Sequence, residues 1–246
     1  MTERNDNISP VTIYLTRHGE TTANVMHLMQ GWSDFPLTQQ GVEGTKQLGR
    51  GLKGIHFTAA YAGSLTRQYQ TARNALDYSG NEQVEVQINP DLREANFGSY
   101  EGYVSAELMG SLFGGNHFSR LAQVHDELGW DAVAQLQDRI CELDQDNALH
   151  TLLDLKDRAE SSQQVAQRMK KALQEIGVQT SCDGGGNVLV VSSGSAIELF
   201  LLTLQREHVP MPAFHNNSVT RLVYEAGSFS VDGPIASTEY FERGLA

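Results

Sequence analysis

The sequence predicts an α/β fold in which helices cover a mostly parallel central sheet with an antiparallel edge. Three observations predict it. Short segments with the period-two alternation of strands recur between segments of helical spacing over most of the chain. Residues 188–191 form a continuous apolar run, as in a central parallel strand. Residues 218–224 and 228–231, joined by a short connection, are typical of an antiparallel hairpin.

The composition indicates a globular protein. Of its 246 residues, 40% are hydrophobic, which is enough for a sizeable core, and with no linker or repeat we expect a single domain over 1–246. The net charge of −12 argues against nucleic acid or an anionic membrane as partner. Residues 1–10 lack an apolar signal core, and the apolar stretch 196–204 is too short to span a bilayer. Cys141 and Cys182 are far apart and belong to no metal-spaced cluster. Two isolated cysteines are typical of a reducing cytoplasm, and a disulfide between them stays open at this point.

The first half of the chain alternates strands with helices. Predicted strands lie at 11–16, 58–62 and 84–88, and predicted helices reach residue 24, cover 38–52 and end near residue 78. Thr21 and Ser64 are suited to cap the first and third of these helices. Residues 92–98 are too polar for the core, so they are predicted to form a loop.

The second half begins with a helical insertion at about 103–155, which we expect to lie above the sheet. Its histidines lack the mutual spacing of metal ligands. A capping box at 161–164 opens a further amphipathic helix, and residues 196–204 predict a buried one. The glycines at 184–186 precede a strand rather than follow it, which excludes a dinucleotide fingerprint.

The end of the first strand carries the most reactive residues. Arg17, His18 and Gly19 follow its last alternating positions, and ligands of open α/β sheets bind beyond the carboxyl ends of strands. Arginine offers a fork of donors that matches phosphate oxygens, and a fixed imidazole nitrogen can attack phosphorus. The triplet therefore predicts a phosphate site, and the alternative is a surface arginine beside a packed histidine.

Several separated segments carry a family resemblance. They are Arg17-His18-Gly19-Glu20-Thr21 with Asn24, residues 30–38 with Gly41, Ser64-Leu65-Thr66-Arg67 with Thr71-Ala72, Leu92-Arg93-Glu94 with Phe97-Gly98 and Glu101-Gly102, and residues 188–194. In this order they resemble the histidine phosphatase superfamily, also called the phosphoglycerate mutase-like family. The resemblance covers nearly the whole chain and implies a three-layer α/β/α sandwich whose helical insertion forms a lid.

The resemblance implies a role for each matched residue. His18 is expected to take the phosphoryl group and pass it to water, and Glu94 to protonate the leaving group and then activate the water. Arg17 and Arg67 are expected to hold the phosphoryl oxygens. Asn24 would donate one more hydrogen bond, with Gln30 and Gly31 on the substrate side. No metal or cofactor is expected, and the expected partner is a small phosphorylated substrate, with a homodimer left open.

One position departs from the family pattern. Ser193 stands where the family has its second histidine, next to Gly194, and both are expected to contact the phosphoryl group. A serine hydroxyl brings no charge, and the loss of one such donor costs ~10²–10³ in rate. Two hypotheses follow: a metal-independent phosphomonoesterase working through His18, and a catalytically impaired relative that binds a phosphorylated ligand. A phosphoglycerate mutase is a further alternative, disfavoured because residues 103–107 lack the arginine-rich segment of such mutases.

Overall fold

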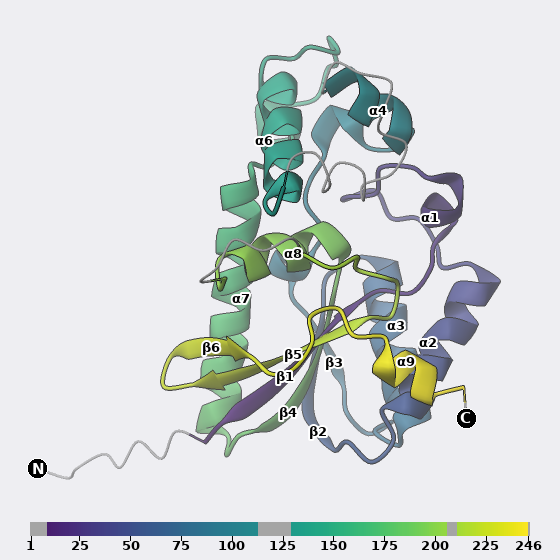
Figure 1. The fold of residues 1–246 in the computed structure, drawn as a ribbon, viewed down its shortest axis with the longest axis vertical. Helices are drawn as coiled ribbons and strands as arrows, with labels where there is room; N and C mark the ends of the chain where they lie inside the picture. The colour runs from purple at the N-terminus through teal and green to yellow at the C-terminus, as the bar shows by residue number, and fades with distance from the viewer. Residues whose placement is uncertain (1–8, 113–128, 206–210, 246) are drawn as a thin grey trace, which may run out of the picture.

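A computed structural model describes residues 9–112, 129–205 and 211–245. Its centre is a mixed sheet of order β3-β2-β4-β1-β5-β6 (Figure 1). The strands are β1 (Val11–Arg17), β2 (Phe57–Ala62), β3 (Val86–Ile88), β4 (Gly186–Ser192), β5 (Val219–Glu225) and β6 (Ser228–Val231).

The pairing of the strands confirms the mostly parallel sheet with an antiparallel edge. β1 pairs parallel with β4, β4 with β2, and β2 with β3, whereas β5 runs antiparallel to β1 and carries β6 as a hairpin. The register sets Arg17 opposite Ser192, so β1 and β4 end side by side. The residues that follow these two strands therefore meet at one edge of the sheet.

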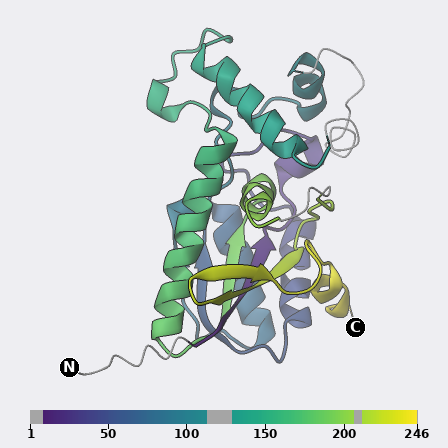
Figure 2. The ribbon, with the colours of Figure 1, turned by 60° about the vertical axis from the view of Figure 1, so that its left-hand side comes forward.

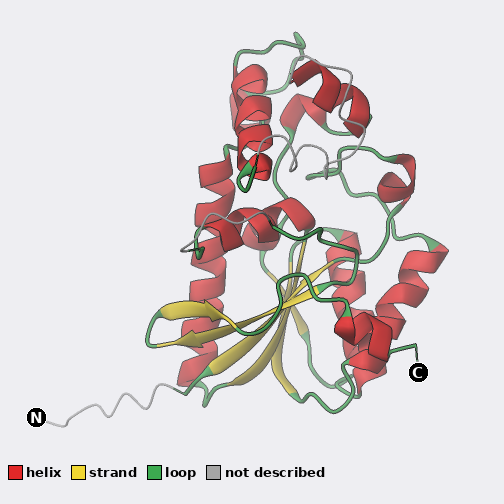
Figure 3. Ribbon diagram, in the orientation of Figure 1, coloured by secondary structure: helices red, strands yellow, loops and turns green. Residues whose placement is uncertain are grey.

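Helices cover both faces of the sheet (Figures 1 and 3). On one face lie α2 (Gln39–Gly51), α3 (Thr66–Ser79) and α9 (Glu239–Arg243), and on the other α7 (Ser162–Cys182) and α8 (Gly194–Leu202). Successive side chains of a strand point to opposite faces of the sheet. Ile13 and Val190 therefore pack under α7 and α8, whereas Tyr14 and Leu189 pack under α2 and α3. The fold is the three-layer α/β/α sandwich that the sequence predicted.

The insertion stands beyond the carboxyl ends of the strands, next to the short helix α1 (Thr22–Met26) (Figure 2). Its described elements are α4 (Ser105–Leu112), α6 (Ala132–Gln145) and the 3₁₀ turn η3 (Leu155–Asp157). The apolar side of α6, including Val133, Leu136 and Ile140, belongs to the same core as α7 and α8. This packing attaches the insertion to the sandwich above the site.

The connecting segment 92–98, between the turns η1 (Pro90–Leu92) and η2 (Gly98–Tyr100), corrects one expectation. It is a loop, but a buried one rather than one outside the core: Leu92 and Ala95 are inaccessible and Glu94 is 6% exposed. Protein donors satisfy several of its carbonyls: the guanidinium of Arg168 donates to the carbonyls of Arg93 and Glu94, and also to that of Asp91 just before the segment. A buried loop is stable only when its backbone groups are paired in this way.

Smaller features differ little from expectation. The Thr21 cap of α1 and the Ser161 capping box of α7 are both present. Ser64 is not a cap, since α3 begins at Thr66 with Leu65 before it. Cys141 and Cys182 are free thiols. Within the described ranges, no helix has the length and apolar character needed to cross a membrane.

Candidate active site

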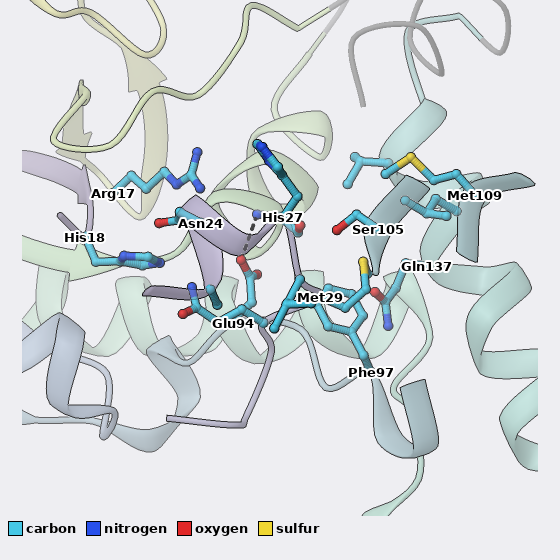
Figure 4. Close-up of a pocket in the computed structure, with 16 residues that line it drawn as sticks. Arg17, His18, Asn24, His27, Met29, Glu94, Phe97, Ser105, Met109 and Gln137 are labelled. Carbon is cyan, nitrogen blue, oxygen red and sulfur yellow. Dashed lines mark hydrogen bonds between the residues drawn. The ribbon is translucent and has the colours of Figure 1, made fainter. Parts of the chain in front are cut away.

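The carboxyl ends of β1 and β4 open into a cavity of about 680 Å³ between the sheet and the insertion (Figure 4). The amide of His18 bonds the carbonyl of Ser192 at 3.1 Å, which joins the two strand ends. The cavity is lined by Arg17, His18, Ala23, Asn24, His27, Leu28, Met29, Gln30, Glu94, Phe97, Ser105, Met109, Val133, Leu136, Gln137 and Ser195. Five of the residues that the sequence predicted thus share one cavity: Arg17, His18, Asn24, Gln30 and Glu94.

His18 is held as a neutral imidazole. Its ring is 2% exposed, and Nδ1 lies 2.7 Å from the carbonyl oxygen of Gly19. A carbonyl accepts only from an N–H, so Nδ1 carries the proton and Nε2 keeps its lone pair. Burial, together with the positive charges of Arg67 and Arg17, holds the pKa of His18 well below its usual range. Near neutral pH, Nε2 of His18 is therefore unprotonated and can act as a nucleophile.

Two arginines place positive charge near His18: Arg17 is half-buried and lines the cavity, whereas Arg67 is fully buried and lies outside the lining. The Nη1 of Arg17 donates to the carbonyl of Phe214, and Arg67 donates from Nη1 to Ser33 O at 2.9 Å and from Nη2 to Gly31 O at 2.7 Å. The Nε of each arginine is buried and has no hydrogen-bond partner in the described part of the chain. Burial lowers the pKa of both guanidinium groups, which start from a value so high that they stay charged. Two cationic side chains whose charges act on His18, each with an unsatisfied Nε, favour an anion next to the nucleophile.

Glu94 faces the cavity from the buried loop. Its Oε1 accepts from the amides of Ala95 at 2.8 Å and Ala196 at 2.7 Å, and its Oε2 from the amide of Ser195 at 3.1 Å. Two of these donors belong to the first turn of α8, whose start favours a carboxylate. Burial nevertheless raises the pKa of Glu94 above its ordinary value, against these amides and Arg67. A carboxyl with a raised pKa beside the nucleophile is suited to general acid and base work.

The amide side chains are positioned by the cap of α1. Asn24 Oδ1 accepts from the amide of Thr21 at 3.1 Å and from Asn216 Nδ2 at 3.1 Å, which leaves its Nδ2 as the donor for a ligand. Gln30 accepts from the Thr21 hydroxyl at 2.7 Å. Gly31 is outside the lining, where a Cβ would meet Glu101 Oε1 at 2.2 Å. Its role is to admit the carboxylate and to offer its carbonyl to Arg67.

Ser193 and Gly194 also lie outside the cavity lining. Ser193 is fully buried, and its hydroxyl accepts from Gln68 Nε2 at 2.9 Å. The same amide nitrogen bonds the carbonyl of Leu92 at 3.3 Å, and Gln68 Oε1 accepts from the amide of Leu65. Gln68 therefore fills the space beside Ser193. Gly194 lies against Arg17, whose Nε would be 3.4 Å from an added Cβ, an ordinary van der Waals distance.

Sequence reasoning assigned no role to the residues that support the site. Glu101 accepts from the amides of Gly31, Trp32, Ser33 and Phe97 and ties the two loops together. Glu101 belongs to one of the segments that carry the family resemblance, and that position is the sequence signal that could have identified it. Arg168 holds the loop of Glu94 and pairs with Glu160 at 2.7 Å. Glu198, buried on α8, has its pKa raised to about 8 by burial and by Glu94, with Arg17 opposing.

The described residues include no group of three or more histidine, cysteine, aspartate or glutamate side chains placed to hold a metal ion. His27 lines the cavity, and His215 is exposed. Of the insertion's histidines, His150 is exposed, and His117 and His125 lie outside the described residues, as does His208.

Comparison with known proteins decides the family. The family model described as the histidine phosphatase superfamily (branch 1) matches residues 13–143 and 126–234. This chain belongs to the histidine phosphatase superfamily. The match spans every segment on which the sequence resemblance rested, from the Arg17-His18 pair to the end of β4.

Relatives include mutases and phosphatases. A 2,3-bisphosphoglycerate-dependent phosphoglycerate mutase of Parvibaculum lavamentivorans is 35% identical over 38% of this chain and 45% of its own length. The adenosylcobalamin/alpha-ribazole phosphatase of Escherichia coli is 38% identical over 39% of this chain and 46% of its own. The chain thus spans less than half the length of these two curated relatives. The broad-specificity phosphatase YOR283W of Saccharomyces cerevisiae is 26% identical over 83% of this chain and 74% of its own.

The fold has solved counterparts. The crystal structure of a phosphoglycerate mutase from Bacillus anthracis superposes with a TM-score of 0.83 at 31% identity, over 99% of this chain and 100% of that one. This similarity confirms the fold that the sequence predicted.

Proposed function

We propose that this protein is a metal-independent phosphomonoesterase that acts on a small phosphorylated metabolite through a phosphohistidine at His18. The observation that carries the proposal is the geometry of His18: a buried, neutral imidazole with Nδ1 bonded to Gly19 O and a free Nε2, in a cavity shared with Arg17 and Glu94 and under the positive charge of Arg67.

The first half of the reaction transfers the phosphoryl group. Nε2 of His18 attacks phosphorus, the bond from phosphorus to the ester oxygen breaks, and that oxygen takes the proton of Glu94 as the alcohol leaves. The positive charges of Arg17 and Arg67, which both act on His18, would stabilise the charge that collects on the phosphoryl oxygens in the transition state.

The second half releases phosphate. Glu94, now a carboxylate held by the amides of Ala95, Ser195 and Ala196, removes a proton from water. The water oxygen attacks phosphorus, the bond to Nε2 breaks, and the electron pair returns to the imidazole. Glu94 ends the cycle protonated, as it began.

Hydrolysis of p-nitrophenyl phosphate in the presence of EDTA tests this function. We expect turnover with EDTA to equal turnover without it, because the proposed chemistry uses only side chains. Loss of activity with EDTA and recovery with added Mg²⁺ would contradict the proposal.

The buried pair of Gln68 and Ser193 supports a second candidate, a relative that binds a phosphorylated ligand with little turnover. By the sequence resemblance, Ser193 stands where the family has its second histidine. It offers the phosphoryl group no charge, and its side chain is fully buried and bonded to Gln68. Both arginines would still bind the ligand. The two candidates differ in turnover rather than in ligand chemistry.

The double variant Ser193→His/Gln68→Ala is expected to raise kcat/KM on p-nitrophenyl phosphate at least tenfold. A charge-assisted donor of this kind contributes about 1.5–3 kcal/mol. Ser193→His alone should gain less, because the imidazole has to displace a side chain that is packed and bonded on both of its amide atoms. Steady-state kinetics across pH 5–8 measure both.

Gln68→Ala completes the double-mutant cycle and measures the effect of removing the Gln68 side chain alone. If the wild type already turns over rapidly and the double variant gains nothing, the pair is an adapted part of a working site. If neither protein turns over any ester while both bind phosphate, the binding function is correct.

A further inference from the structure

The cavity extends well past the residues that would hold a phosphoryl group. Its volume of about 680 Å³ lies in the range of sites that enclose whole organic ligands, roughly 300–1,000 Å³. In Figure 4, Arg17 and His18 lie at one end, and Phe97 and Met109 at the other. The alcohol part of a substrate therefore has to fill the second end.

The wall at that end is apolar. Its residues come from the loop after α1, the buried loop and the insertion, and they are Met29, Phe97, Met109, Val133 and Leu136. All five are less than a tenth exposed, and all belong to the core that joins the insertion to the sheet. The wall is thus part of a packed core and presents carbon and sulfur to the ligand.

The carboxylate and the guanidinium among the described lining residues both lie toward the phosphoryl end. Among the described residues that line the cavity, Arg17 and Glu94 are the ionisable side chains apart from His18 and His27. Neither α4 nor α6 contributes a lysine or an arginine to this lining. A second anionic group on the substrate would lose water there without meeting a described cation, which is costly.

Neutral polar groups complete the wall. Gln137 donates from Nε2 to Asn96 O at 3.1 Å and to Glu160 O at 2.6 Å, so its amide oxygen is the atom that it offers to the cavity. The Ser105 side chain also lines this part of the cavity. These groups suit a hydroxyl or amide on an uncharged body.

We propose that the substrates are phosphomonoesters of uncharged, largely apolar alcohols longer than three carbons, whose body lies against Met109, Val133 and Leu136. The inference rests on the proposed phosphatase function. It separates this chain from enzymes that act on phosphate esters bearing a carboxylate, since such esters bring a second charge to the apolar wall.

The test uses three esters with similar alkyl leaving groups: ethyl phosphate, hexyl phosphate and 6-phosphooxyhexanoate. We expect kcat/KM for hexyl phosphate to exceed that for each of the other two at least tenfold. Burial of one methylene group alone is worth about fourfold. Equal values for hexyl and ethyl phosphate, or a preference for the carboxylated ester, would overturn the inference and leave the phosphatase function standing.

Binding separates the two proposals. Calorimetry with ethylphosphonate, hexylphosphonate and 6-phosphonohexanoate, which cannot be hydrolysed, measures the same preference without turnover. Tight binding of hexylphosphonate by a protein that hydrolyses no ester would overturn the phosphatase function and support the assignment of the apolar wall. Equal binding of all three phosphonates would overturn that assignment.

Two variants test where the alcohol part of the substrate binds. Met109→Lys puts a cation on the wall and is expected to reverse the preference between hexylphosphonate and 6-phosphonohexanoate. Leu152→Lys makes the same chemical change on the same insertion, at a fully exposed side chain outside the lining, and should leave the preference unchanged. An unchanged preference in a folded Met109→Lys, shown by its melting curve, would contradict the placement of the alcohol. If Met109→Lys does not fold, the three phosphonates on the wild type still decide.

Discussion

Replacing His18 with alanine is expected to lower kcat on p-nitrophenyl phosphate by about 10⁴-fold or more, as removal of a catalytic nucleophile does. The phosphoryl group then has no nitrogen to accept it, although Arg17 and Arg67 remain to bind it. KM should change far less than kcat, because phosphate recognition is left to the arginines. Steady-state kinetics measure both parameters.

His215→Ala is the matched control, since it removes an exposed imidazole from the loop that bonds the end of β1. We expect it to keep kcat within a few-fold of wild type. Full activity in His18→Ala would mean that another group receives the phosphoryl group or that water attacks directly.

The second large effect concerns Glu94. Glu94→Gln is expected to lower kcat/KM on alkyl phosphates by about 10²–10⁴-fold, the usual contribution of a general acid. The loss on p-nitrophenyl phosphate should be much smaller, because nitrophenolate leaves without protonation. The ratio of the two losses is the measurement.

The pH profile gives an independent reading of Glu94. Because burial raises the pKa of its carboxyl, the acid form persists to higher pH than for an exposed glutamate. Activity on alkyl phosphates should fall as the pH rises through that raised pKa, and Glu94→Gln should lack this fall. The pKa of His18 is lowered, so its protonation affects only the acid side.

Glu101→Gln serves as a control for the shape of the site. Glu101 accepts from the backbone of both loops and is absent from the cavity lining, so its loss should affect alkyl and aryl esters equally. If Glu94→Gln also affects both esters equally, Glu94 only shapes the site.

The sheet could be predicted because its signals are local. Alternation in 11–16 and the apolar run 188–191 predict the two central strands, β1 and β4, whose adjacent ends carry the site. The Arg17-His18-Gly19 triplet needs only its position after a strand to suggest phosphate. His18 and Glu94 share a cavity because the ends of parallel strands and their loops meet at one edge.

The supporting contacts could not be predicted because they join residues far apart in sequence. Segment 92–98 is polar in composition, yet it is buried because Arg168, from α7, satisfies its carbonyls. Likewise, the hydrogen bond from Gln68 to Ser193 joins residues at the starts of α3 and α8. It places the serine in a buried contact outside the cavity lining, where the sequence had suggested a contact with the phosphoryl group. Neither the periodicity of one sequence nor the spacing of its motifs indicates such long-range pairs.

The insertion shows a third limit. Its helical spacing was visible, but spacing alone does not say which side of α6 faces the cavity. In the structure Val133 and Leu136 line the cavity while Ile140 packs inward with the core. The chemistry of the substrate's alcohol therefore had to come from the structure.

Trapping the intermediate tests the phosphohistidine most directly. The protein is quenched in alkali during turnover of a phosphate ester, digested, and analysed by mass spectrometry for a phosphorylated peptide. The account predicts phosphate on His18, stable to base and lost in acid, and none in the matched His18→Ala sample. Phosphate on a serine, or turnover with no phosphorylated protein at any quench time, would contradict it.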